Sequence, residues 1–493
     1  MKINYSTIAL AAAAVISQST VFAADETDIQ KAIEYVKKHE KDGTVNASGT
    51  GLVSANGENS INLTGLVHFD AHGFKSDLPR ISDKDSASLA DAFEFRRVRL
   101  GVNGTVFKDV DYQVILNATG SDTNILDTGY LNFSANKAAQ VRVGRFRQPY
   151  SLEAMTSDGY IDFLERSYGD QLGPNKLLGA MVWGEPVKGF TYGVAVSQAG
   201  FSELSNSDQL GGLGTARGTV NFGELNNLKD QVVHLGFSTN RGVYEVTPTI
   251  SSNTGSAVDT QARATILSFR SEDRGLANIF RAQLGGETVT GGTYGSAAND
   301  VARIDKKLND LEFAYAVGAF KFQTEYTTFS FDSSAPTTTA VTAYNYLNVR
   351  GDTTYYEFVY NITNEQWSDA YKGGAFTGVK PNSNYRFGNG GTGAWQAALR
   401  YSTYNIRTPL NTNTVPSANK IENTVSTSDL SSSGQTITWG LNWLLNPNTA
   451  VKFNYAVTKF NQPVKLLSVT PDSAKNATTT FENTVSVRAQ INF

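Results

Sequence analysis

The chain has 493 residues, among them 44 glycines, 22 tyrosines and 27 phenylalanines, with no cysteine and a formal net charge of −4 at pH 7. The lack of cysteine excludes a disulfide scaffold, a thiolate metal site and a cysteine nucleophile, and the charge gives no overall basic footprint for nucleic acid. After the N-terminus no run of 18 apolar residues appears, which argues against a helical membrane protein but leaves a β-barrel open.

The N-terminus has the layout of a secretory signal peptide. Lys2 provides a positive start, Ile8–Ile16 is a compact apolar stretch, and Val21–Ala23 offers a cleavage site after Ala23. Residues 1–23 are therefore expected to be removed during export. Residues 24–44 follow as a short, highly charged segment in which Ile29, Ile33 and Val36 recur at helical spacing. We expect a small periplasmic helix there, with a frayed solvated segment as the alternative.

The remaining chain, 45–493, alternates apolar and polar residues with period two, which predicts β-strands. The pattern begins near Ile61–Phe69, where Ile61, Val67 and Phe69 alternate with His68 and Asp70, and it recurs around Phe320–Tyr326, Trp395–Tyr401, Ile437–Trp443 and Val451–Val457. Aromatic-rich apolar faces opposite charged faces suit a wall between lipid and water. We count 18 candidate strands.

The links between these strands alternate in length. Turns near Phe107–Asp109, Asn136–Lys137, Gly184–Val187, Gly318 and Asn446–Asn448 are short, whereas other links are long and rich in Ser, Thr, Asn and Gly. Short periplasmic turns and long external loops are typical of outer-membrane barrels. The stretch Ile362–Gly393 departs from this rule, because it is long where a short turn is expected.

The last strand ends at the chain terminus in Phe493. Val485, Val487, Ala489, Ile491 and Phe493 share one face of it. An apolar strand face ending in a terminal phenylalanine has the form of the signal by which the barrel-insertion machinery selects its substrates. A soluble β-sandwich could show the same alternation, but has no reason to end on that aromatic residue.

Several motifs resemble the phosphate-selective porin O and P family. They are, in chain order, Glu94–Gly101, Val143–Pro149 followed by Glu153, Phe163–Ser167, Thr363–Glu365 with Val379–Pro381, Gly393–Trp395 with Leu399–Ser402, and Gly440–Trp443 with Asn446–Pro447. The resemblance implies a trimeric 16-stranded porin with an internally folded loop narrowing the pore. It also implies a phosphate or polyphosphate channel lined by arginines and lysines, to which Arg96, Arg97 and Arg99 would contribute.

Strand parity sorts charged residues to the lumen. An apparent change of parity near Arg96 and Arg97 predicts a β-bulge that turns both guanidiniums inward. The basic residues placed in the lumen by parity are Arg97, Arg99, Arg142, Arg217, Arg270, Arg281, Lys321, Arg400, Lys452 and Arg488. The acidic ones are Asp70, Asp111, Glu312, Glu325 and Glu357. This excess of cations predicts moderate anion preference, with wall charges that pair across strands as the alternative for any single residue.

The segment 147–176 is the candidate constriction loop. It carries the basic residues Arg147, Arg166 and Lys176 and the acidic residues Glu153, Asp158, Asp162, Glu165 and Asp170. A strong phosphate site needs several converging cations. A net acidic loop therefore conflicts with strict phosphate specificity while leaving the porin interpretation intact.

Metal binding and catalysis find little support. His68 and His72 share a strand face with Asp70, but residues i and i+4 on a strand lie about 13 Å apart, so the two imidazoles cannot share an ion. The chain has four histidines and no G-x-S-x-G sequence, so an outer-membrane barrel enzyme lacks a recognisable nucleophile and base.

We therefore expect an all-β, transmembrane antiparallel barrel of about 16 strands in a Gram-negative outer membrane. It would pass small hydrophilic solutes without catalysis or cofactor and favour anions, phosphate or polyphosphate among them. Expected partners are outer-membrane lipid and lipopolysaccharide, the insertion machinery and two further copies of the chain. A general or other-solute porin is the main alternative, and an adhesin with a plugged lumen is a third.

Overall fold

A computed structural model describes residues 45–48, 50–54, 56–76, 92–119, 125–198, 212–228, 230–246, 265–272, 279–284, 302–334, 348–407, 431–465 and 478–493. The expected signal peptide 1–23 and the expected helix within 24–44 lie outside these residues, as do the middles of most long links. Among the described residues, none of the helices is long and apolar enough to cross a membrane.

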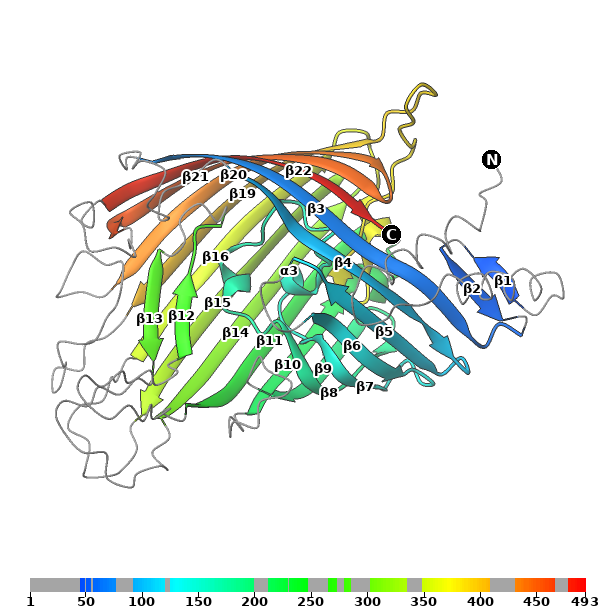
Figure 1. The fold of residues 1–493 in the computed structure, drawn as a ribbon, viewed down its shortest axis with the longest axis horizontal. Coiled ribbons are helices and arrows are strands. Elements are labelled where there is room, and N and C mark those ends of the chain that lie inside the picture. Colours follow the sequence, from blue (N-terminus) through cyan, green and yellow to red (C-terminus); the bar gives the residue numbers. More distant parts are fainter. Residues whose placement is uncertain are drawn as a thin grey trace, which may run out of the picture.

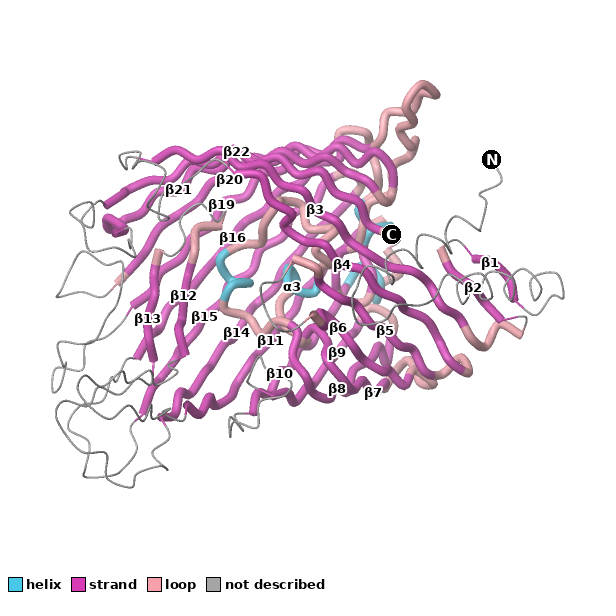
Figure 2. The backbone as a smooth tube through the Cα atoms, in the orientation of Figure 1, coloured by secondary structure: helices cyan, strands magenta, loops and turns pink. Residues whose placement is uncertain are grey.

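Sixteen antiparallel strands form a closed barrel (Figures 1 and 2). They are β3 (Ser60–Ser76), β4 (Ala92–Val106), β5 (Val110–Asn117), β6 (Leu126–Phe133), β7 (Gln140–Arg147), β8 (Lys176–Val187), β9 (Phe190–Gln198), β10 (Gly212–Asn221), β11 (Gln231–Val246), β14 (Ala302–Val317), β15 (Phe320–Ser334), β16 (Asn348–Asn361), β19 (Ala394–Arg407), β20 (Ser432–Asn446), β21 (Thr449–Lys465) and β22 (Thr478–Asn492).

The barrel closes where the last strand, β22, pairs with β3. At the end of this seam, the Phe493 and Gly65 backbones exchange two hydrogen bonds of 2.7 and 3.0 Å. A side chain at position 65 would collide with the Phe493 ring, because an added Cβ would lie 2.4 Å from its Cζ. The terminal aromatic residue therefore covers a glycine across the closing seam.

The wall has fewer strands than the 18 candidates counted from the sequence, and other short strands lie outside it. The hairpin β1 (Val45–Ser48) and β2 (Gly51–Ser54) extends the sheet from β3 and projects from one end (Figure 1). Two further hairpins form separate small sheets: β12 (Thr265–Phe269) with β13 (Phe280–Leu284), and β17 (Tyr371–Lys372) with β18 (Ala375–Phe376). The 16 strands implied by the family resemblance are confirmed.

The period-two pattern sorts side chains as predicted. On β22, Val485, Val487 and Ile491 are exposed on the outer surface, whereas Ser486 and Arg488 are buried in the lumen. The same division holds on β20, where Trp439 and Leu441 are exposed and Thr438 and Asn442 are fully buried. An outer surface of this kind is stable against lipid and unfavourable in water.

Most of the predicted short turns are confirmed. The links at residues 107–109, 318–319 and 447–448 join consecutive strands as expected. One turn is displaced: β8 continues through Val187, and the chain reverses at Lys188 and Gly189, where Gly189 adopts a φ of 84°. Glycine populates that backbone region at little cost.

Candidate functional site

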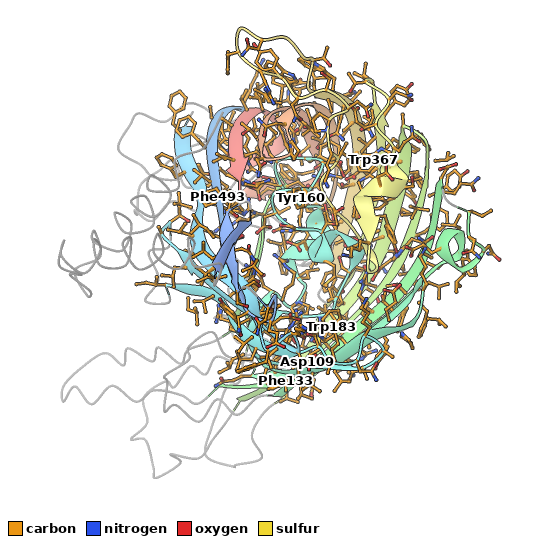
Figure 3. The ribbon with its side chains drawn as sticks, turned by 90° about the vertical axis from the view of Figure 1, so that its right-hand side faces the viewer. Asp109, Phe133, Tyr160, Trp183, Trp367 and Phe493 are labelled. Carbon is orange, nitrogen blue, oxygen red and sulfur yellow. The ribbon has the colours of Figure 1, made fainter. Side chains whose placement is uncertain are left out.

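The constriction loop (147–176) links β7 to β8 and folds into the lumen. It contains a four-residue helix, α3 (Leu152–Met155), and a 3-10 turn, η1 (Tyr168–Gln171). Ser151 caps α3, because its hydroxyl accepts a hydrogen bond from the Ala154 amide. Viewed from the short-turn end, Tyr160 of this loop lies near the middle of the barrel (Figure 3). The loop therefore lies inside the barrel.

Four of the predicted lumen cations contact this loop from the wall strands β15, β19, β21 and β22. Arg488 forms two hydrogen bonds of 2.7 and 2.6 Å with Asp70 and donates to the Leu164 carbonyl at 2.6 Å. Arg400 contacts Glu153 at 3.3 Å, Lys321 pairs with Asp162, and Lys452 donates to the Ile161 carbonyl. All four cations are almost completely buried. They therefore anchor the loop instead of lining an open passage.

Arg217 and Arg142 also face the lumen but have other partners. Arg217 makes a bidentate contact with Glu312, at 2.8 and 2.6 Å. Arg142 stacks between the rings of Tyr130 and Trp183, at 4.2 and 4.8 Å from their centroids. Such stacking holds the guanidinium without neutralising it.

Arg281 and Arg270 differ from the prediction. They were expected on barrel strands, but Arg281 lies in β13 and Arg270 directly follows β12. This hairpin is a separate two-stranded sheet, so strand parity of the wall does not apply to it.

The predicted bulge on β4 is present. The register of β3 with β4 shifts after His68, which pairs with Arg97, so that Phe69 pairs with Phe95 and Arg96 is the extra residue. Arg96 then reaches the Glu165 carboxylate at 2.6 and 3.0 Å. Arg97 lies 3.7 Å from Glu165 and 3.6 Å from Asp158. The bulge directs both guanidiniums towards the constriction loop.

Asp158 is the centre of the arginine cluster. Arg99 donates to it directly, Arg166 does so at 2.5 Å, and Arg147 lies 3.7 Å away. Burial raises the pKa of the Asp158 carboxyl, but the neighbouring guanidiniums, led by Arg166, outweigh burial and hold that pKa well below its usual range. Asp158 is therefore ionised and surrounded by positive charge.

The acidity of the constriction loop is neutralised by its surroundings. Each of its five carboxylates lies within 4 Å of at least one Arg or Lys. In addition to the pairs described above, Arg166 lies 3.8 Å from Asp170, and Arg488 lies 3.3 Å from Glu165. The net charge of the loop residues alone therefore does not describe the electrostatic field in the lumen. The conflict with phosphate binding that we inferred from this charge does not follow.

Apolar packing fills the lumen on the side of β14 to β22. One cluster joins Leu152 and Phe163 of the constriction loop to Trp367 and Phe376 of the segment 362–393, which includes the 3-10 turn η2 (Trp367–Ala370). A second cluster joins Tyr168 to Phe269 and Phe280 of the β12–β13 region. The anomalous long link 362–393 thus folds into the barrel with its first part, up to Val379, whereas most residues from Lys380 to Thr392 are exposed.

Two cavities remain on the opposite side, beside β4 to β8, each of about 380 Å³. The outer chamber lies towards the long loops and is lined by Arg96, Arg97, Arg166 and Arg270 among others. The inner chamber reaches Asn448 and Phe493 at the short-turn end and is lined by Gln113, Arg142 and Lys176 among others. Arg99, Arg147 and Asp158 line both chambers. We call the place where these three side chains separate the chambers the neck.

At this neck the cationic side chains are more exposed than the acidic one. The side chains of Arg99 and Arg147 keep 18% and 19% of their surface exposed, against 4% for Asp158. Arg96, which lines the outer chamber, and Lys176, which lines the inner chamber, are also partly exposed, with 23% and 14% of their side-chain surface accessible. Asp170 at the outer chamber, 28% exposed, is the main acidic exception. The passage therefore presents mainly positive charge.

Sequence reasoning missed some residues of this site. Arg147 was recognised only as a charge of the loop, although it is the last residue of β7 and lines the neck. Asp127, which pairs with Arg99 at 3.2 Å and also with Lys176, was not singled out. Asp127 is the extra residue where the register of β5 with β6 shifts, so strand parity does not place its side chain.

The two histidines of β3 have different neighbours. His68 is fully buried and its Nδ1 lies 3.5 Å from Arg97. His72 instead lies 3.7 Å from Asp70 and 3.5 Å from Glu94.

Residues 61–493 match the phosphate-selective porin O and P family. The chain belongs to this family. It is 25% identical over 385 residues to Porin O of Pseudomonas aeruginosa, covering 76% of this chain and 78% of that protein. The family and the closed barrel identify an outer-membrane porin, whose fold is that of a channel.

Solved structures of outer-membrane proteins match this chain at low sequence identity. A loop-deletion mutant of the outer-membrane protein OmpT of Vibrio cholerae matches with a TM-score of 0.49 and 11% identity, covering 88% of this chain and all of that one. An anion-selective porin from Comamonas acidovorans matches with a TM-score of 0.48 and 13% identity, with the same coverage.

Proposed function

We propose that this porin passes small hydrophilic anions through the outer chamber, the neck and the inner chamber. The observation that carries the proposal is the unequal exposure at the neck, where Arg99 and Arg147 are open and Asp158 is almost covered. In a narrow passage with low-dielectric walls, exposed cations raise the local concentration of anions and repel cations.

Phosphate or polyphosphate is the specific solute that we propose. The guanidiniums of Arg96, Arg99, Arg147 and Arg166 converge on the outer chamber, and arginine forks match phosphate oxygens better than a single ammonium does. The name of the family agrees with this choice. A general anion porin without phosphate preference is the second candidate, because the arginines already have carboxylate partners.

We further propose that the mature protein begins after Ala23, assembles as a homotrimer and lies with its long loops towards lipopolysaccharide. Its β22 strand, ending in Phe493, would be read by the barrel-insertion machinery. The open aliphatic outer face of β22 fits contact with lipid.

The test is electrical. Purified protein is reconstituted in planar bilayers, the reversal potential is measured under a KCl gradient, and phosphate is then added. We expect the potential to report anion preference and millimolar phosphate to reduce the chloride current. Anion preference without phosphate block would support the general anion porin. Cation preference would contradict both.

A further inference from the structure

A short hairpin leaves the barrel at its short-turn end. We call residues 380–392 the arm; they follow the part of segment 362–393 that folds into the lumen. Figure 1 shows the arm, in gold, projecting sideways beyond the outer surface of the wall, and Figure 3 shows the same from the short-turn end. The arm reverses at its tip, where the Arg386 amide donates to the Gly390 carbonyl at 3.0 Å. An arm that points sideways from the barrel reaches towards the surrounding membrane.

Hydrogen bonds at both ends hold the arm against the wall. The Tyr385 amide donates to the Leu445 carbonyl at 2.7 Å. Near the return of the arm to the barrel, the Trp443 indole nitrogen donates to the Thr392 carbonyl at 2.9 Å. Leu445 and Trp443 both belong to β20. The arm is therefore built onto one wall strand, which holds its tip in place.

A row of aromatic rings runs from the wall to the tip of the arm. Trp395 of β19 stacks on Trp443 of β20, with ring centroids 5.2 Å apart and planes at 14°. Tyr385 contacts Trp443 edge-on at 4.8 Å, and Phe387 contacts Tyr385 at 5.1 Å. Strand alternation puts Trp395 and Trp443 on the same outer face as the exposed Trp439. The row therefore extends the lipid-facing surface of the barrel into the arm.

The outer end of this row is open. Phe387 is 82% exposed, the highest value among the large apolar side chains in the described part of the chain. Aromatic residues at the rims of membrane barrels lie at headgroup level, where they meet the membrane interface. An apolar ring held so far from any core is unfavourable in water and is stabilised by insertion between lipids.

The arm is also cationic. It contains Lys380 and Arg386 and no Asp or Glu. Both cations are exposed, and neither takes part in an ion pair among the described residues. Basic side chains at a membrane surface are attracted to anionic lipid headgroups, and their aliphatic stems lie along apolar surface while the charge stays at the interface. The charge of the arm therefore complements an anionic phospholipid surface.

A neighbouring copy of the chain is the other candidate for covering the arm. The strands that carry the arm, β19 and β20, have 14 and 15 residues, whereas β5, β6 and β7 have eight each. A tilted strand needs about 9–11 residues to cross a bilayer, so the side of β5 to β7 is suited to protein contact in the homotrimer proposed above. In the closed barrel β7 lies opposite β19, so the arm is on the side that faces lipid.

We propose that the arm is a lipid anchor that inserts Phe387 into the membrane leaflet on the short-turn side and binds anionic phospholipid headgroups through Lys380 and Arg386. In the orientation proposed above, this leaflet is the periplasmic one. The arm lies outside the lumen, so its contact with lipid does not depend on which solute the chambers pass.

The test measures lipid contact at the tip, with the mature chain reconstituted in vesicles. Because the chain has no cysteine, Asn389→Cys accepts a single fluorophore two residues from Phe387. The vesicles contain phosphatidylcholine, with or without phosphatidylglycerol, and a lipid with a nitroxide at headgroup level quenches any fluorophore that it touches. Lys372→Cys is the matched control, because Lys372 is exposed in the same link but on the part folded into the barrel. We expect several-fold stronger quenching at Asn389→Cys, increased further by phosphatidylglycerol.

Two variants in the Asn389→Cys chain assign the contact to its residues. Phe387→Ala should remove most of the quenching, and Arg386→Gln should reduce its dependence on phosphatidylglycerol. Quenching no stronger at Asn389→Cys than at Lys372→Cys would overturn the proposal, as would full quenching in Phe387→Ala. A fluorophore that is shielded from water in lipid-free detergent trimers and exposed in monomers would also overturn it, because a neighbouring copy then covers the arm.

Discussion

Arginine side chains in this barrel have two separate roles, distinguished by burial. Arg400 and Arg488 are at most 1% exposed and hold the constriction loop through carboxylates and carbonyls. Arg99 and Arg147 retain open surface at the neck between the chambers. A buried, paired charge contributes little field to the pore, whereas an open one acts on passing ions.

Arg99→Gln should therefore reduce the ratio of anion to cation permeability. The variant removes an open cation and also leaves Asp158 and Asp127 with one guanidinium fewer. The ratio is obtained from reversal potentials in a KCl gradient. Arg350→Gln is the control, because Arg350 pairs with Asp332 on an exposed part of β16. An unchanged ratio in Arg99→Gln would remove Arg99 from the conduction path.

Glu153 makes stability depend on pH. Burial raises its pKa to about 7, with Arg400 opposing the shift, from an ordinary value of 4.5. The folded state thus holds this proton more tightly than the unfolded state, and the stabilisation present below pH 4.5 is lost as pH rises to about 7. At 1.36 kcal/mol for each pKa unit, the loss is about 3 kcal/mol.

We expect Glu153→Gln to flatten the fall in the free energy of unfolding between pH 5 and about 7. Urea unfolding in detergent micelles at a series of pH values measures this slope. Glu185→Gln, at an exposed position near the end of β8, should retain the wild-type slope. The same slope in Glu153→Gln and wild type would contradict the assignment of the proton to Glu153.

At the scale of elements, period two in the sequence predicted the wall strands and the bulge at Arg96. Wall strands face lipid on one side and polar lumen on the other, so each strand carries the whole signal locally. The packing of segment 362–393 could not be predicted in this way. Trp367 and Phe376 have no strand periodicity, and their partners Leu152 and Phe163 lie more than 200 residues away in the sequence.

The candidate site, like the fold, was predictable only where the signal is local in the sequence. Local parity placed Arg97, Arg99 and Arg488 in the lumen, and the length of the link 147–176 identified the loop. Carboxylates of that loop, such as Asp158 and Glu165, determine which cations anchor the loop and which remain exposed in the chambers. Those contacts join distant parts of the chain and leave no local pattern.

The buried part of segment 362–393, residues 367–379, should limit conductance by filling the lumen. Trp367 is 2% exposed and packs against Phe376, with Lys321 4.5 Å above its ring. Trp367→Ala should cost about 3–5 kcal/mol of packing, loosen the segment and raise single-channel conductance. Phe387→Ala, in the same segment but 82% exposed, is the control. Wild-type conductance in Trp367→Ala would mean that this packing does not limit the passage.

At the scale of the whole molecule, the barrel is filled on one side and open on the other. The constriction loop, the β12–β13 region and residues 367–379 pack against the wall from β14 to β22. The two chambers run beside β4 to β8. A 16-stranded wall is wide enough for an aqueous channel, and we propose that the path left beside these insertions is off-centre.

The location of this path can be measured directly because the chain contains no cysteine. Gln113→Cys places a thiol in the inner chamber, and Thr438→Cys places one on the filled side, where Thr438 is fully buried. A negatively charged methanethiosulfonate is added while current is recorded in planar bilayers. We predict that it reduces the current of Gln113→Cys and leaves Thr438→Cys unchanged. Loss of current in Thr438→Cys with no effect on Gln113→Cys would contradict the account.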